Sequence, residues 1–143
     1  MNVNLTFDTV EKVLHIADVH IRNYNRHKEY RQVFRKLYKA AKKLPTNSLI
    51  YVAGDIVHTK TDISPELVQM VSEFLNNLAK IRPTVIIAGN HDANLNNSSR
   101  LDALTPIVEN LNNDNLYYLK DSGIYTFADI DFIVYSILEN SDS

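Results

Sequence analysis

The chain has 143 residues, of which 45% are hydrophobic and 22% charged, a balance typical of a globular domain and not of a disordered chain. It contains no cysteine, which excludes disulfides and zinc sites built on thiolates. The apolar runs are only strand-sized and residues 1–12 lack the pattern of a signal peptide, so we expect an intracellular protein with no membrane span.

Strand and helix signals alternate along the chain. Apolar runs predict strands over residues 13–17, 49–53, 84–88 and 116–119, and a hairpin over 123–137. Helices are predicted over residues 27–44 and 105–111, and another helix is predicted to begin at a Ser64 cap followed by Pro65. This order predicts an α/β fold, a mostly parallel sheet flanked by helices, in a single domain spanning residues 1–143. We expect His15, in the middle of the first strand, to be a hydrogen-bonded core residue.

Three short polar motifs each follow one of these apolar runs. They are Asp18-Val19-His20, Gly54-Asp55-Ile56-Val57-His58 and Gly89-Asn90-His91-Asp92. Each motif alone is a weak signal, because Asp-x-His is a common pattern and the two glycine motifs are also typical of turns. Together, at the carboxyl ends of three predicted parallel strands, they indicate one site, because ligands gather at that edge of such a sheet.

The side chains in these motifs favour metal chemistry. In extended backbone Asp18 and His20 point to the same side, so we expect them to bind one ion together. Asp55 has two carboxylate oxygens that could bridge two ions, and Asn90 offers a neutral amide oxygen to the second. A set of oxygen and nitrogen ligands without sulfur suits Mn²⁺, Fe or Zn²⁺ better than Ca²⁺. Two such ions, about 3.5–4 Å apart, can hold a phosphate and activate a water.

The remaining polar residues of the motifs are candidates for proton transfer and phosphate contact. His91 is the best placed proton donor to a leaving group, and Asp92 could orient it or raise its pKa. His58 lies three residues beyond Asp55, where it could touch the phosphate or the leaving oxygen.

These motifs, in this order, resemble the signature of the calcineurin-like metallophosphoesterase superfamily. The sequence around Asp18, together with the Gly54–His58 motif, looks like the DNA repair nuclease branch, similar to bacterial SbcD. The resemblance implies a nuclease that hydrolyses phosphodiesters with two divalent metal ions, expected to be Mn²⁺. It also implies a dimer, an ATPase partner of the SbcC type, and DNA as the substrate.

The same resemblance assigns roles to the residues of the motifs. Asp18, His20 and Asp55 would bind one metal, and Asp55 with Asn90 the other. The histidine matching His91 would be catalytic, and the one matching His58 would act on the DNA phosphate. Family members carry further histidines downstream that complete both metal shells, whereas no histidine follows His91 in this chain. The resemblance therefore covers the N-terminal part of the fold, and we expect the isolated chain to be weakly active or inactive.

A basic segment follows the first motif. Nine Lys/Arg and one acid lie from Arg22 to Lys43, a local charge of +8, so the rest of the chain carries −10. Arg22 and Arg26, just past His20, are candidates for contact with the DNA backbone. Further cations form a stripe at helical spacing, which we expect opposite the apolar face of the helix; these are Lys28, Arg31, Arg35, Lys39 and Lys42. A solvated helix surface is the alternative interpretation.

Two other functions stay open from the sequence. One is a phosphatase or cyclic-nucleotide phosphodiesterase of the same superfamily, against which His58 and the basic segment argue. The other is a truncated, non-catalytic fragment that binds DNA or a partner, which the absent histidines favour.

Overall fold

The computed structural model describes residues 1–21, 27–57, 64–88 and 104–135. In chain order the elements are β1 (Asn2–Val3), β2 (Lys12–Ile16), α1 (His27–Ala41), β3 (Ser48–Ala53), α2 (Pro65–Ile81), β4 (Thr84–Ile87), α3 (Thr105–Leu111), β5 (Leu116–Tyr118), β6 (Gly123–Phe127) and β7 (Ile130–Val134). Every predicted strand and helix is present, with ends that differ by a few residues. The two-residue strand β1 was not predicted, because it is too short to show a periodicity.

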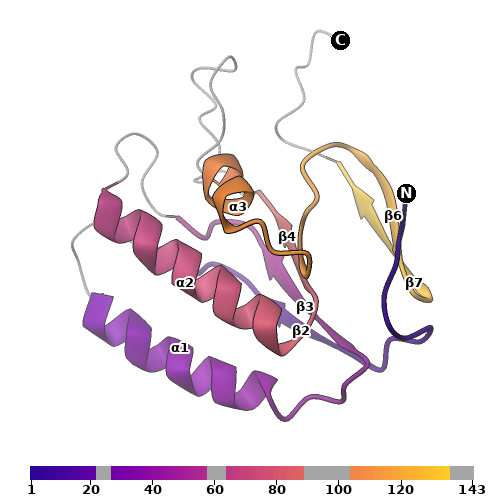
Figure 1. Cartoon of the computed structure of the whole chain (residues 1–143), viewed down its shortest axis with the longest axis horizontal. Coiled ribbons are helices and arrows are strands. Elements are labelled where there is room, and N and C mark those ends of the chain that lie inside the picture. The colour runs from indigo at the N-terminus through magenta and orange to yellow at the C-terminus, as the bar shows by residue number, and fades with distance from the viewer. Residues whose placement is uncertain (22–26, 58–63, 89–103, 136–143) are drawn as a thin grey trace, which may run out of the picture.

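A parallel sheet forms the centre of the fold, as predicted. Its strands run in the order β2-β3-β4-β5, each parallel to its neighbour. The three helices cover one face of this sheet (Figure 1). Their core is apolar and closely packed: the rings of Phe34 on α1 and Phe74 on α2 stack with centroids 4.3 Å apart, and Val52 and Ile86 of the sheet are fully buried in the same cluster. The α/β class is therefore confirmed.

A second sheet packs against the opposite face of the parallel sheet. It has the order β1-β6-β7, with β1 parallel to β6 and β6 antiparallel to β7. The rings of Tyr51 and Phe132 face each other across the two sheets with centroids 5.3 Å apart, and those of Tyr117 and Phe127 with centroids 5.2 Å apart. The predicted hairpin thus becomes part of a second layer. The N-terminal residues add its outer strand, where the Met1 ammonium donates to the Ile124 carbonyl at 2.8 Å.

The start of α2 follows the sequence signals closely. The Ser64 hydroxyl accepts a hydrogen bond from the Leu67 amide at 3.1 Å, and Pro65 occupies the first helical position, where no amide hydrogen is needed. At the other end Arg82 leaves the helix in extended backbone, and its guanidinium donates to the Pro45 carbonyl at 3.0 Å. These contacts mark the two ends of α2.

The expectation for His15 is wrong. The residue is exposed, because β2 is the edge strand of the parallel sheet and has a neighbour on one side only. The imidazole packs against the Tyr51 ring with centroids 5.1 Å apart, on the face away from the helices. An apolar run bounded by polar residues does not reveal whether a strand lies at the centre or at the edge of its sheet.

Among the described residues, no helix is both long enough and apolar enough to cross a membrane.

Candidate metal centre

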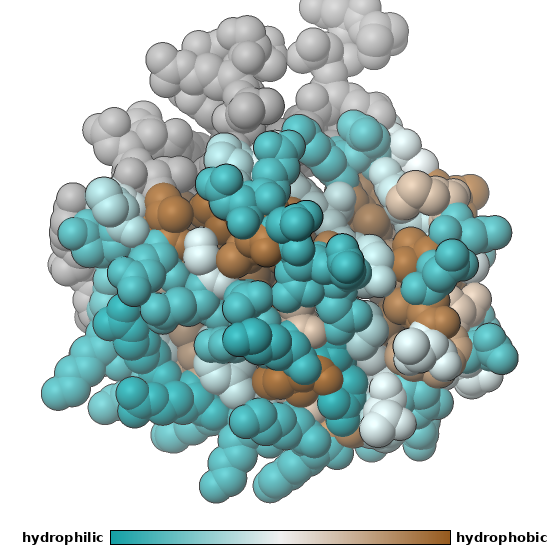
Figure 2. Space-filling model, viewed as in Figure 1, coloured by the Kyte–Doolittle hydropathy of each residue, from teal (hydrophilic) through white to brown (hydrophobic). Residues whose placement is uncertain are grey.

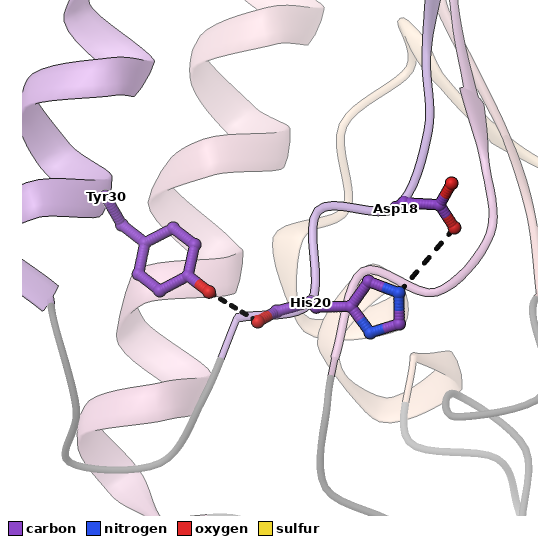
Figure 3. A network of polar contacts seen from close by, with 3 residues as sticks. All are labelled: Asp18, His20 and Tyr30. Carbon is purple, nitrogen blue, oxygen red and sulfur yellow. Dashed lines mark hydrogen bonds and ion pairs between the residues drawn. The ribbon is translucent and has the colours of Figure 1, made fainter.

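Three of the predicted ligands converge at the carboxyl edge of the parallel sheet. Asp18 and His20 lie just beyond β2, and Asp55 lies just beyond the neighbouring strand β3. One ligand atom from each side chain lies within 4.8 Å of the others. The His20 Nε2 atom is 3.6 Å from the nearer Asp18 carboxylate oxygen, and Figure 3 shows the imidazole turned toward that carboxylate. The prediction that these residues meet in space is confirmed.

Backbone hydrogen bonds hold the two ligand loops in register. The His20 amide donates to the Asp55 carbonyl at 2.8 Å, and the Ile21 amide donates to the Ile56 carbonyl at 2.7 Å. Ile21 and Val57 then form an isolated parallel bridge, and both are fully buried. The pairing of β2 with β3 thus continues past the strand ends. It links ligands from two separate loops through main chain, which is stiffer than side-chain contacts.

The backbone conformation of Asp18 and His20 differs from the extended one expected, and Asp55 shares the observed conformation. Asp18, His20 and Asp55 all have positive φ, at 55°, 49° and 51°, and Gly54 precedes Asp55 with φ of 80°. Asp18 and His20 therefore converge through left-handed turns and not through the alternation of a strand. Such a conformation costs on the order of 1–3 kcal/mol for a residue other than glycine, and it collects at functional sites. Aspartate tolerates it better than most residues.

Tyr30 supports the site from α1 and was not recognised from the sequence. Its hydroxyl donates to the His20 carbonyl at 2.6 Å (Figure 3), and its ring lies beside Phe34 with centroids 5.9 Å apart. The available signal was a tyrosine on the apolar face of the helix, since a partly buried phenol usually needs a hydrogen-bond partner. The bond ties the first turn of α1 to the loop that carries two ligands.

Exposure varies across the cluster. The Asp18 side chain is 78% exposed and the His20 side chain 29% exposed, while Asp55 is half-buried. The site is therefore open to solvent on the Asp18 side and backed by protein on the Asp55 side. The three ligand atoms lie within 4.8 Å of one another, and Asp18 has room to rotate. They can therefore move closer together, until each is about 2.0–2.2 Å from one ion. Two carboxylates and an imidazole fit a divalent transition metal.

The other predicted site residues lie outside the described residues. These are the proposed second-metal ligand, the proposed catalytic and phosphate-contacting residues, and the proposed DNA contacts: Asn90, His91, Asp92, His58, Arg22 and Arg26. Their roles stay predictions.

Comparison with known proteins identifies the family and is consistent with a metal centre at this edge of the sheet. Residues 11–140 match the Calcineurin-like phosphoesterase family. The chain is 46% identical over 134 residues to an uncharacterized protein of Acanthamoeba polyphaga mimivirus, an alignment that covers 92% of this chain and 10% of that protein. The chain thus spans about a tenth of the length of that viral relative. With the match covering most of its length, and with an Asp-His-Asp cluster at the carboxyl edge of its parallel sheet, the chain belongs to the calcineurin-like phosphoesterase family.

Proposed function

We propose that this domain hydrolyses the phosphodiester bonds of DNA with two divalent metal ions, as part of a repair or recombination nuclease. The observation that carries the proposal is the cluster of Asp18, His20 and Asp55, whose ligand atoms lie within 4.8 Å of one another. Membership of the phosphoesterase family supports hydrolysis and the use of divalent metal. The His58 motif and the basic segment support DNA over a small phosphoester.

In this proposal each side chain of the site has a defined role. Asp18, His20 and Asp55 would hold one ion, and Asp55 and Asn90 would hold the other. Divalent metal bound there would stabilise charge on the phosphate and lower the pKa of a water. His91 donates the proton that the leaving oxygen needs, Asp92 orients His91, and His58 contacts the phosphate.

The ligand set predicts unequal affinities for the two ions. The first ion has three protein ligands, which the backbone bonds between the two loops bring together. The second has Asp55 and Asn90 alone among the residues proposed. We expect the first ion to bind more tightly, and we propose Mn²⁺ for both. In the whole protein we propose a dimer that works with an ATPase of the SbcC type, and an intracellular location.

The proposal is tested by DNA cleavage in the presence of Mn²⁺. We expect the wild type to cleave slowly and His91→Asn to lose this activity. His15→Asn is the matched control, because His15 is exposed and packs against Tyr51, not against the metal cluster. Equal cleavage by wild type and His91→Asn would refute the role of His91.

The same assay separates the two rival functions. Faster hydrolysis of a small phosphoester than of DNA would favour a phosphatase or cyclic-nucleotide phosphodiesterase. DNA binding without turnover of either substrate would favour a non-catalytic binding fragment.

A further inference from the structure

A groove runs between α1 and α2, separate from the metal cluster. It has a volume of about 290 Å³, and the stacked rings of Phe34 and Phe74 contribute to its lining. Arg31 and Arg35 line it from α1, and Glu73 and Asn77 line it from α2. The groove therefore combines an aromatic surface with two guanidinium groups on one wall.

The position of these arginines differs from the one expected from the sequence. The cationic stripe was predicted to lie opposite the apolar face of α1, but Arg31 and Arg35 lie beside Phe34, at the boundary with α2. All five stripe residues are exposed, and none of them forms an ion pair with a carboxylate from the described part of the chain. Hydrophilic side chains cover the surface over α1 in Figure 2.

Tyr38 keeps the wall beside the arginines uncharged. Burial raises the pKa of its phenol, a side-chain hydrogen bond with Asn77 lowers it, and the nearby Glu73 carboxylate raises it, with a net upward shift. The phenol therefore stays neutral at physiological pH, and Glu73 is the one carboxylate among the described residues that line the groove.

The groove is connected to the metal site through α1. Tyr30 bonds to the His20 carbonyl, and Arg31 is the next residue along the helix. The N-termini of α1 and α2 both lie toward the carboxyl edge of the sheet, and both helices run away from it side by side (Figure 1). From Lys28 to Lys42 the stripe extends about 21 Å at 1.5 Å per residue, roughly the rise of six nucleotides at 3.4 Å each.

We propose that the groove between α1 and α2 carries the phosphate backbone of a nucleic acid strand away from the metal site, with Arg31 and Arg35 each contacting a phosphate. The identity of the partner rests on the proposed function. Charge complementarity supports it, because the described residues 27–43 hold seven Lys/Arg and one acid, a charge of +6, in a chain whose remainder carries −8. A polyanion is attracted to this face and repelled by the rest of the surface.

The test is the salt dependence of oligonucleotide binding, measured by fluorescence anisotropy in EDTA so that no hydrolysis occurs. Loss of two phosphate contacts in Arg31→Gln/Arg35→Gln should reduce the slope of log K against log salt by about 1.8 for duplex DNA or about 1.4 for a single strand. Between 50 and 200 mM salt, the wild type should then lose about 12-fold more duplex affinity than the variant. All variants are first checked for an unchanged melting temperature.

Two further variants make the test specific to the groove. Lys36→Gln/Lys43→Gln removes the same charge from exposed positions outside the stripe. It should change the slope by no more than one phosphate contact does, about 0.9. Glu73→Gln removes the carboxylate on the opposite wall and should tighten binding. An unchanged slope in the arginine variant, or equal slope changes in both double variants, would overturn the proposal.

The outcome is distinguishable from failure of the proposed function. A reduced slope in EDTA without cleavage in Mn²⁺ would support the groove and contradict the slow cleavage expected of this chain. Cleavage with an unchanged slope would overturn the groove alone. No oligonucleotide binding by the wild type at 50 mM salt would overturn the groove together with the choice of DNA as substrate.

Discussion

The positive φ of Asp18, in the candidate metal cluster, can be tested by replacing this residue with glycine or with alanine. Both changes remove the carboxylate, which is 78% exposed and packs little, but only glycine relieves the left-handed backbone at φ 55°. Left-handed backbone costs an alanine at this position about 1–2 kcal/mol. A glycine lowers the free energy of unfolding by about 0.4–1 kcal/mol, because it raises the entropy of the unfolded chain. Asp18→Gly should therefore be more stable than Asp18→Ala by about 0.5–1 kcal/mol.

Urea and thermal unfolding in EDTA measure this difference without a contribution from metal. Each 1 kcal/mol should shift the melting temperature by roughly 3–5 °C for a chain of this size. Asp8 is the control, because it is exposed and has no positive φ. There the order should reverse, with alanine the more stable by about 0.4–1 kcal/mol. If Asp18→Ala were as stable as Asp18→Gly, the backbone at position 18 would not be strained.

Three further predictions concern the groups that support the fold and the site. Ser64→Ala should lower the free energy of unfolding by about 1 kcal/mol, because the Leu67 amide loses its acceptor. Thermal melting measures the change, with Ser72→Ala in the interior of α2 as a control that should be slightly stabilising. Tyr30→Phe should cost about 0.5–1.5 kcal/mol in urea unfolding and also weaken Mn²⁺ binding, whereas loss of stability without loss of affinity would mean that Tyr30 does not position His20. Burial raises the pKa of Tyr51, so the folded state holds this proton more tightly, and stability is full below about pH 10 and falls above it. Tyr51→Phe should reduce this loss of stability between pH 9 and pH 11. An equal loss in both proteins would contradict a raised pKa of Tyr51.

The sequence predicted the parallel sheet and its ligand-bearing edge because two simple rules act there. Apolar runs of strand length alternate with amphipathic helices, and the carboxyl ends of parallel strands meet at one edge. Asp18 and Asp55 both follow such runs, so their convergence needed no knowledge of side-chain packing. The Ser64 cap was predictable for the same reason, since it depends on local hydrogen bonding alone.

Other features depend on contacts that no local pattern records. The exposure of His15 follows from the edge position of β2, which is a property of the whole sheet. The bond from Tyr30 to His20, and the pairing of the His20 amide with Asp55, join residues from separate elements. Positive φ at Asp18 and His20 was not predictable from an Asp-x-His spacing, because extended backbone also satisfies that spacing. Strand β1 is held by pairing with β6, more than a hundred residues away, and not by its own sequence.

The metal cluster is tested most directly by calorimetry of Mn²⁺ binding to the wild type, Asp55→Ala and His15→Ala. Asp55 belongs to the Asp-His-Asp cluster, whereas His15 is exposed and packs against Tyr51. Loss of a residue that only supports a ligand typically costs about 10–100-fold in metal affinity, so loss of Asp55 itself should cost at least about 100-fold. We predict that Asp55→Ala loses this affinity while His15→Ala binds like the wild type. Equal Mn²⁺ affinity in all three proteins would show that the cluster beyond β2 and β3 is not a metal site.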